Sequence, residues 1–526
     1  MIRRTVNPRP REYPEGLDIG LLKIAGVCVL AALMASLDTT VVSVAQRTFI
    51  TEFHSTQAVV AWTMTGNTLA LATVIPLTGW AANRFGTRRL FMGSVLAFTC
   101  GSLLCAMAPN ITLLIAFRVV QGLGSGMLMP LAFTILTRAA GPKRLGRLMA
   151  VLGIATLLGP MGGPILSGWL IGSFGWEWIF LINIPIGALA FTLAAVVFKW
   201  DESHLSQTFD FVGMLLLSPG LASFLYGVSS LPAHGTVTNR AVWIPASAGL
   251  LLIIGFVFHA LFRADHPLLD LRLFKNRTVA LANTTMLLLG IAFFGALLLI
   301  PSYFQQLLGQ TPLQSGVHMI PRGAGAMLTM PIAGRIMDRR GPGWVVLVGI
   351  TLIAIGMGTF AYGVSHQYAY TPVLLTGMAV MGMGIGSTMM PVLGSAVRGL
   401  ASHQVAGGST LIHVNLQVAG SIGTALMSVI LTSQFNHSPF IQAAGRVAAL
   451  KQELSKRGMP HHPALPPQAL QPGFMDHVTS DLSHAYTVVF VVAVGFALTT
   501  LIPAVFLPKK PVVDVPGQPA IPALAP

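Results

Sequence analysis

Apolar residues form long runs along almost the whole chain, separated by short segments rich in polar and charged residues. A helix of about 20 apolar residues is long enough to cross a hydrocarbon layer of roughly 30 Å. The pattern therefore predicts an all-α polytopic membrane protein with 14 transmembrane helices. The expected spans cover 21–46, 60–81, 89–107, 112–136, 148–172, 179–199, 211–229, 241–263, 279–300, 316–337, 344–362, 370–395, 405–432 and 485–508.

Composition supports this prediction. The chain has 526 residues, of which 54% are hydrophobic and only 9% are charged, whereas a soluble protein carries roughly 25% charged residues. The net charge of +15 would fit a nucleic-acid partner, but Lys and Arg lie in short clusters between apolar runs, as in proteins oriented in a bilayer by positive charge. We therefore expect the lipid bilayer, and no nucleic acid, as a partner, with both termini in the cytoplasm.

The spans group into a few regions around one long outer loop. The expected regions are a cytoplasmic segment (1–20), a six-helix bundle (21–200), two inserted helices (201–270), a second six-helix bundle (271–508) and a cytoplasmic tail (509–526). The outer loop covers 433–484, and its helical periodicity, with Glu453 and Arg457 four residues apart, favours a surface helix against the bilayer. Docking of a periplasmic adaptor on 433–484 is the alternative interpretation.

Two short basic turns reveal an internal repeat. The first contains Gly79, Asn83, Arg84, Gly86 and Arg88, and the second contains Gly334, Asp338, Arg339 and Gly341. A glycine-rich run follows each turn, at 122–126 and 382–386. The second turn follows the tenth span instead of the eighth, so two helices are inserted between two six-helix halves. Parallel halves of this kind indicate alternating access around a central cavity.

Several motifs carry a resemblance to a known family. They are the first turn, Leu37-Asp38-Thr39-Thr40-Val41-Val42, Arg118-Val-Val-Gln121-Gly122, and a fifth-helix motif with Gly159, Pro160, Gly163, Pro164 and Gly168. The turn resembles the signature loop of the major facilitator superfamily, and the two extra helices resemble its fourteen-helix drug:proton antiporter branch, the EmrB/QacA type. The resemblance implies the major facilitator fold, multidrug efflux with antibiotic resistance, and a place in the bacterial cytoplasmic (inner) membrane. It also implies that the fifth-helix motif limits leakage through the cavity.

The chain departs from the family pattern at a few positions. Asn83 stands where the signature loop usually has aspartate, and Ser167 stands where the fifth-helix motif usually has glycine. In relatives the loop aspartate helps to lock the cytoplasmic gate through charge pairs. We therefore expect that lock to be weaker here or shifted to Arg84 and Arg88, while the second copy keeps Asp338.

Asp38 is the one acidic residue that is clearly embedded in a predicted span, and Arg118 is expected at a similar depth. An ionisable group in the membrane costs several kcal/mol unless it is paired or hydrated, which makes it a functional candidate. We expect the two residues to form a proton-coupling pair, in which protonation of Asp38 frees Arg118. A fixed salt bridge between helices is the structural alternative.

Other polar or aromatic side chains in the spans, or at their ends, are candidates for the substrate cavity. They are Trp62, Asn67, Gln121, Tyr303, Gln305, Arg322, His413 and Gln417. His413 could titrate near neutral pH, although such a histidine is more often a hydrogen-bonded packing residue.

These observations favour proton-coupled export of small lipophilic molecules, such as drugs, with a small-molecule substrate and protons as partners. Two alternatives are an exporter of lipids or siderophores with a periplasmic partner, and a non-transporting membrane receptor. No P-loop sequence occurs, which argues against ATP hydrolysis. We expect neither a metal site nor a cofactor, and no enzyme activity, because no embedded His/Glu cluster and no nucleophile with a nearby base is evident.

Overall fold

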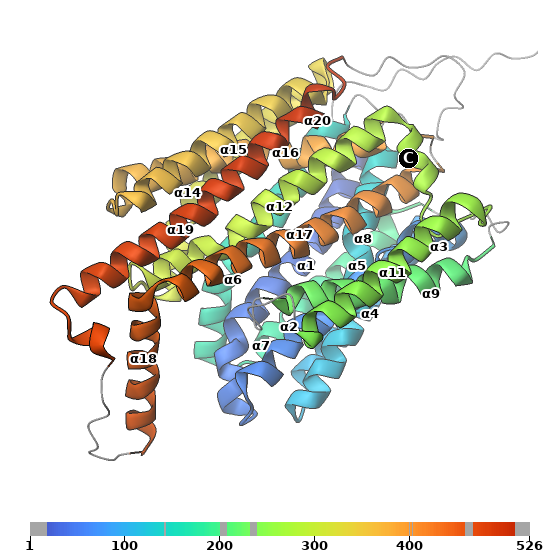
Figure 1. Ribbon diagram of the computed structural model, residues 1–526. Coiled ribbons are helices and arrows are strands. Elements are labelled where there is room, and N and C mark those ends of the chain that lie inside the picture. Colours follow the sequence, from blue (N-terminus) through green and yellow to red (C-terminus); the bar gives the residue numbers. More distant parts are fainter. Residues whose placement is uncertain are drawn as a thin grey trace, which may run out of the picture.

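The computed structural model consists of long helices that lie side by side along one direction (Figure 1). It describes residues 18–140, 144–199, 208–231, 239–398, 400–401, 403–457 and 466–510. The predicted terminal segments therefore lie almost entirely outside the described residues. The described ranges confirm the all-α fold class, since their regular elements are all helical.

The first half contains eight helical elements. They are α1 (Ile19–Glu52), α2 (Gln57–Val74), α3 (Leu77–Phe85), α4 (Thr87–Ala106), α5 (Ile111–Ala140), α6 (Leu145–Phe174), α7 (Trp178–Leu181) and α8 (Asn183–Val197). The second predicted span is broken, because α2 and α3 meet at an angle of 55°. Pro76 lies at this break, and it lacks the N–H that would continue the helix.

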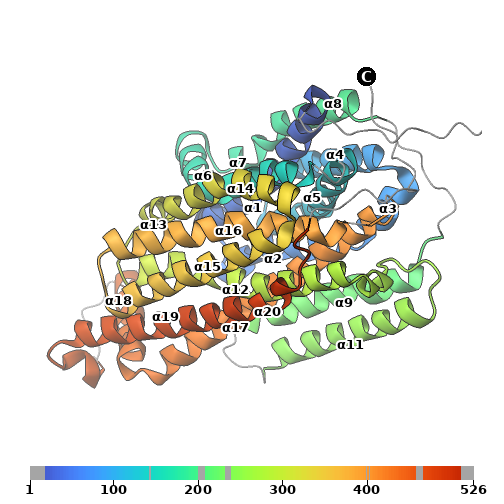
Figure 2. The ribbon, with the colours of Figure 1, turned by 90° about the horizontal axis from the view of Figure 1, so that it is seen from above.

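The inserted pair consists of α9 (Phe211–Ser229) and α11 (Arg240–Phe262), which pack against each other. α9 also contacts α2 of the first half and α17 of the second, so the pair lies beside the junction of the halves (Figure 2). The second half follows with η1 (Leu271–Lys275), α12 (Arg277–Gln306), α13 (Pro312–His318), α14 (Ile320–Arg340), α15 (Pro342–Ser365), η2 (Tyr370–Leu374), α16 (Leu375–Val397), α17 (Val405–His437), α18 (Pro439–Arg457), η3 (Pro467–Leu470), α19 (Phe474–Thr499) and α20 (Leu501–Val505).

The number of membrane spans is consistent with the predicted fourteen. In the described ranges, 12 helical segments are long and apolar enough to cross a bilayer, and the bent pair of α2 and α3 is a thirteenth. The remaining predicted span, 316–337, is formed mainly by α14. This helix carries Arg322, Arg335 and Asp338 and is therefore less apolar than the others. It packs against α6 and α16, so protein surrounds much of it in place of lipid.

The packing of the helices repeats between the halves. A Cβ atom on Gly101 would meet Gln121, and one on Gly356 would meet Met381. Equivalent residues of α2 and α4 lie 255 positions apart (67 and 322, 98 and 353, 101 and 356), and those of α5 lie 260 positions apart (121 and 381, 122 and 382, 124 and 384). The pairing of α5 with α2 and α4 is thus repeated by α16 with α14 and α15. The parallel repeat predicted from the two basic turns is present in the helix packing itself.

The apolar core joins the two halves at one end of the bundle and is divided between them at the other. We call these the inner end, predicted to face the cytoplasm, and the outer end. One cluster at the inner end combines Leu148 and Leu152 of α6 with Met390 and Leu393 of α16. At the outer end, one cluster lies in the first half and a separate cluster lies in the second half. The two halves are therefore packed together at their inner ends.

The predicted outer helix is α18. It leaves the outer end of α17 and lies across the direction of the spanning helices (Figure 1). The Ser438 hydroxyl donates to Asp481 Oδ2 at 2.6 Å and so connects the start of α18 to α19. The side chains of Glu453 and Arg457, whose pairing was predicted, lie outside the described part. His461 and His462 also lie outside it.

Candidate functional site

Asp38 of α1 and Arg118 of α5 form a buried ion pair. The Arg118 Nη1 donates to Asp38 Oδ2 at 2.7 Å, and Arg118 is 1% exposed and Asp38 3% exposed. Arg118 Nε also donates to the backbone oxygen of Thr63 in α2, at 3.2 Å. The pair predicted from sequence is thus in direct contact.

Gln121 completes a triangle with the two charged residues. Its side-chain oxygen accepts from Arg118 Nη1 at 2.6 Å, and its Nε2 donates to Asp38 Oδ1 at 2.8 Å. Nε2 also lies 3.0 Å from Ser102 Oγ of α4, which accepts from Asn183 Nδ2 of α8 at 2.9 Å. Each Asp38 carboxylate oxygen therefore has a donor, and the network joins the helices of the first half.

The fifth-helix motif positions α1 on the other side of this network. Cβ atoms on Gly159 and Gly163 would overlap Ser36 and Thr40, so α6 can approach α1 on both sides of Asp38 only because these positions are glycine. Pro160 and Pro164 lie inside α6, whereas Gly168 has no heavy atom within 4 Å of an added Cβ.

Ser167, which stands where the family usually has glycine, makes a hydrogen bond between helices. Its hydroxyl donates to the backbone oxygen of Val41 at 3.1 Å, which adds a hydrogen bond between α6 and α1.

Sequence reasoning missed three members of the network, namely Thr63, Ser102 and Asn183. Hydroxyls and amides are common in membrane helices, and their partners depend on which helix faces pack together. Asn183 is the first residue of α8, and its sequence context alone assigned it no role.

The second basic turn joins the two halves at the inner end. Asp338 accepts from the backbone N–H of Gly146 at 2.7 Å and from Arg147 Nε at 3.3 Å, both at the start of α6. The N-terminus of a helix favours an anion there. Gly334 lies directly against Gly146, with no room for a Cβ atom on either residue. Nearby, burial lowers the pKa of Arg398, and the carboxylate of Asp338 opposes that shift.

The first basic turn joins the halves through neutral groups. Asn83 Nδ2 donates to the backbone oxygen of His403 across the boundary at 3.3 Å, and Asn83 Oδ1 accepts from Arg138 of its own half at 3.2 Å. Gly79 approaches Gly407 and Thr410 of α17. Among the described contacts, Asp338 at the second turn makes a charged one between the halves, with Arg147.

The remaining turn residues have simpler roles. Gly86 and Gly341 have φ values of 84° and 86°, which glycine adopts without strain. Arg88 Nη2 donates to the backbone oxygen of Ala195 at 2.5 Å, and Arg339 is exposed. The predicted shift of the lock to Arg84 and Arg88 stays a prediction.

The predicted cavity residues do not form one cluster. Gln121 belongs to the buried network. Tyr303 is packed among Phe304, Phe360, Tyr486 and Phe490 in the second half. Gln305 is exposed at the outer end of α12, and Gln417 is partly buried in α17.

Three other candidates are buried. His413 Nδ1 donates to the backbone oxygen of Ser409 at 2.7 Å. The His413 ring packs on Phe133 of the other half. Asn67 and Arg322 each have a buried polar atom without a hydrogen-bond partner among the described residues.

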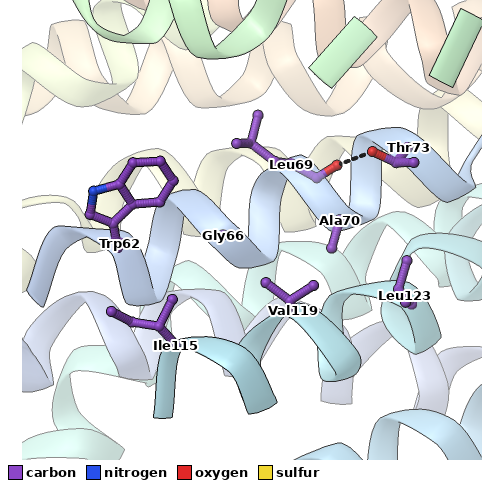
Figure 3. A pocket seen from close by; sticks show the side chains of 8 residues that line it. All are labelled: Trp62, Gly66, Leu69, Ala70, Thr73, Ile115, Val119 and Leu123. Atoms are coloured by element: carbon purple, nitrogen blue, oxygen red, sulfur yellow. Dashed lines mark hydrogen bonds between the residues drawn. The ribbon is translucent and has the colours of Figure 1, made fainter. Parts of the chain in front are cut away.

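Trp62 lies in an apolar groove between α2 and α5 (Figure 3). The groove has a volume of about 390 Å³ and is lined by Trp62, Gly66, Leu69, Ala70, Thr73, Ile115, Val119 and Leu123. The Trp62 ring stacks on Tyr226 of α9, with centroids 5.6 Å apart. The groove therefore lies beside the inserted pair and is separate from the charged network.

Comparisons with known proteins agree with this architecture. The sequence model of the Major Facilitator Superfamily matches residues 28–424. A protein of Mycobacterium tuberculosis (strain ATCC 25618 / H37Rv) described as "Multidrug resistance protein B homolog" is 64% identical over 500 residues, which cover 95% of this chain and 92% of the relative. "Multidrug export protein EmrB" of Escherichia coli (strain K12) is 28% identical over 425 residues, covering 80% of this chain and 81% of the relative.

A solved structure, the human organic anion transporter MFSD10 (TETRAN), is also similar. It has a TM-score of 0.61 at 14% identity and covers 94% of this chain and 100% of that one. At this identity the likeness concerns the fold alone.

Proposed function

Because the chain belongs to the major facilitator superfamily, we propose that it is a proton-coupled exporter of small lipophilic molecules such as drugs. The names of two of its relatives describe multidrug resistance and multidrug export. The observation that carries the proton coupling is the buried pair of Asp38 and Arg118.

The arrangement of the halves supports alternating access. The core is shared at the inner end and divided at the outer end, as expected for a transporter that is closed toward the cytoplasm. Thr39, Ser43 and Arg47 form an exposed polar stripe at successive turns of α1, in the outer half of that helix. A polar stripe at this depth fits a water-filled cleft better than lipid.

The proton acts on the network through charge. When Asp38 is ionised, its two oxygens accept from Arg118 and Gln121. A proton on Asp38 removes the negative charge and leaves Arg118 as an unpaired buried cation, which is strongly unfavourable. α1 is held tightly by α6, so relief of this state requires movement of α1 and α6 relative to α5. We propose that this movement couples proton uptake to the exchange between outward and inward states.

The test measures efflux of a dye, ethidium, from vesicles that contain the purified protein, with and without a pH gradient. We expect Asp38→Asn to abolish the gradient-dependent movement. The matched control is Asp265→Asn, because Asp265 is an exposed acidic residue outside the spans. Normal gradient-driven efflux by the Asp38 variant would overturn the proposed coupling.

The location follows from the same proposal. We place the protein in the bacterial inner membrane with both termini in the cytoplasm, in accord with the clusters of Lys and Arg at the inner end. A periplasmic adaptor would dock on the outer loop at 433–484, where α18 lies across the bundle.

A further inference from the structure

Arg322 is a second arginine inside the predicted spans, and no described residue forms an ion pair with it. It lies in α14 and is 8% exposed. Its Nη1 is buried without a hydrogen-bond partner in the part of the chain that the structure describes. Its guanidinium lies over the ring of Phe293 in α12, 5.1 Å from the centroid.

Arg118, in contrast, has hydrogen-bond acceptors around its guanidinium. It has a carboxylate, a side-chain amide and a backbone oxygen as acceptors. The aromatic face of Phe293 can stabilise the positive charge of Arg322, but it cannot accept the fork of N–H groups as a carboxylate does. Asp38 is the carboxylate among the buried residues that the structure describes, and it is already paired with Arg118, so an anionic partner for Arg322 would have to be a bound molecule.

Arg322 also lies at the boundary between the halves. A Cβ atom on its neighbour Gly323 would collide with the side chain of Met161 in α6 of the first half. A methionine side chain is flexible and can move aside. The backbone of Arg322 is held from behind by Gly382, where a Cβ atom would overlap its carbonyl oxygen. The backbone of Arg322 is thus held against α16, and the residue next to it in the chain contacts a movable side chain of the first half.

The repeat shows that this charge is specific to the second half. Asn67 occupies the equivalent place against Gly122, so the first half has a neutral amide where the second has a cation. The positions equivalent to Arg118 and Gln121 in the second half are Met378 and Met381. The first half therefore holds a neutral ion pair, while the second half holds a net positive charge in apolar surroundings.

We propose that Arg322 binds the acidic group of the exported molecule, so that the substrates include lipophilic organic anions with a carboxylate on an apolar body. The carboxylate accepts from the guanidinium fork, and the apolar body contacts Phe293 and Met161. This inference rests on the proposed export function and adds a substrate class to it.

The test uses the full chain in vesicles with two fluorescent probes of the same size, pyrenebutyrate and its primary amide. The unmodified protein is expected to export the acid at least tenfold faster than the amide under a pH gradient. Arg322→Gln should lower export of the acid at least tenfold and change that of the amide less than twofold. Arg322→Lys, which keeps the charge without the fork, should restore part of the acid export.

Ethidium and a second variant separate the possible failures. Leu328→Ala alters an exposed residue of the same helix and should leave the acid-to-amide ratio unchanged. If the unmodified protein moves none of the three probes, the proposed export function fails. If it exports ethidium but treats acid and amide alike, or if Arg322→Gln lowers both equally, only the role of Arg322 is overturned. Binding of pyrenebutyrate to the purified variants, measured by fluorescence, keeps the test informative where transport is weak.

Discussion

At the scale of single residues, most substitutions in the buried network around Asp38 would remove a hydrogen bond. Each Asp38 oxygen has its own donor, and Gln121 contacts both members of the ion pair. A buried acceptor that loses its partner costs about 1–3 kcal/mol. The network therefore has structural as well as functional consequences, which mutations of Gln121 can separate.

Gln121→Met is the informative change, because methionine is the residue at the equivalent position of the second half. It should lower stability by about 1–3 kcal/mol, since Asp38 Oδ1 loses a donor, and it should alter the pH dependence of transport. Thermal unfolding in detergent measures the first effect and vesicle efflux across a pH range measures the second. Ser167→Gly is the control, with a smaller loss of about 0.5–1.5 kcal/mol for one hydrogen bond. An unchanged pH profile would place Gln121 outside the coupling.

Asn83→Asp tests the neutral contact at the first turn. Aspartate would strengthen the contact to Arg138, but it could not donate to the His403 carbonyl. We expect the equilibrium constant for separation of the inner ends to rise ~2- to 5-fold, because one exposed hydrogen bond contributes about 0.5–1 kcal/mol. Labelling of a cysteine at Thr410, which is buried in the closed inner end, would report this separation. Asn83→Ala should act in the same direction; opposite effects of the two variants would show that Arg138 dominates.

Sequence identified the charged pair because an embedded ion is rare and costly wherever it lies. It could not show that Arg322 Nη1 is unpartnered, because that depends on which described side chains of the neighbouring helices come within reach of it. The neutral members of the network were equally hidden, since a serine or asparagine in a membrane helix can bond to its own backbone.

At the scale of helices, glycine determines how closely the elements approach. Gly146 of α6 and Gly334 of α14 leave no space between their backbones at the inner end. α6 also uses Gly159 and Gly163 to approach α1. This one helix therefore contacts both the charged network and the opposite half.

Gly334→Val should prevent complete closure of the inner end, because its side chain would overlap the backbone of Gly146. Overpacking costs about 1–3 kcal/mol, so the closed state should be depleted roughly tenfold and export should fall to a similar degree. Gly162→Val is the matched control, since nothing lies within 4 Å of a Cβ at that position of α6. Distances between spin labels on α6 and α14 would show whether the inner ends have separated; equal effects of the two variants would contradict a specific closing contact.

Most helices could be located from their apolar runs, but two features could not. The bend between α2 and α3 depends on how α3 packs against α17 as well as on Pro76. The polar character of α14 makes it a weak span by composition alone, and its place in the bundle becomes clear only from its contacts with α6 and α16.

At the scale of the whole molecule, the halves are joined at one end and divided at the other. The sequence predicted two halves with two helices inserted between them. It could not predict which end is closed, because the same residues form the outward and the inward state. The polar stripe of α1 then predicts where water enters.

Cysteines placed at Thr39 or Ser43 should react with a membrane-impermeant maleimide added from the outer side, in a protein whose Cys100 has been replaced by serine. A cysteine at Leu251, exposed on α11, should react slowly because lipid surrounds it. A proton gradient that favours the inward state should lower labelling at Ser43. Equal labelling at Ser43 and Leu251 would show that the stripe does not face a cleft.

The repeated glycine contacts also bear on the symmetry of the molecule. Backbone approaches that recur at offsets of 255 and 260 positions are typical of an internal repeat. Two identical half-length subunits would each contain the same approaches. In such a symmetric pair every buried charge appears twice. A single chain is free of that constraint, so Arg118 and Gln121 lie in one half while Met378 and Met381 fill the corresponding places in the other. Arg322 opposite Asn67 is a second outcome of the same freedom, a division of labour that no homodimer could encode.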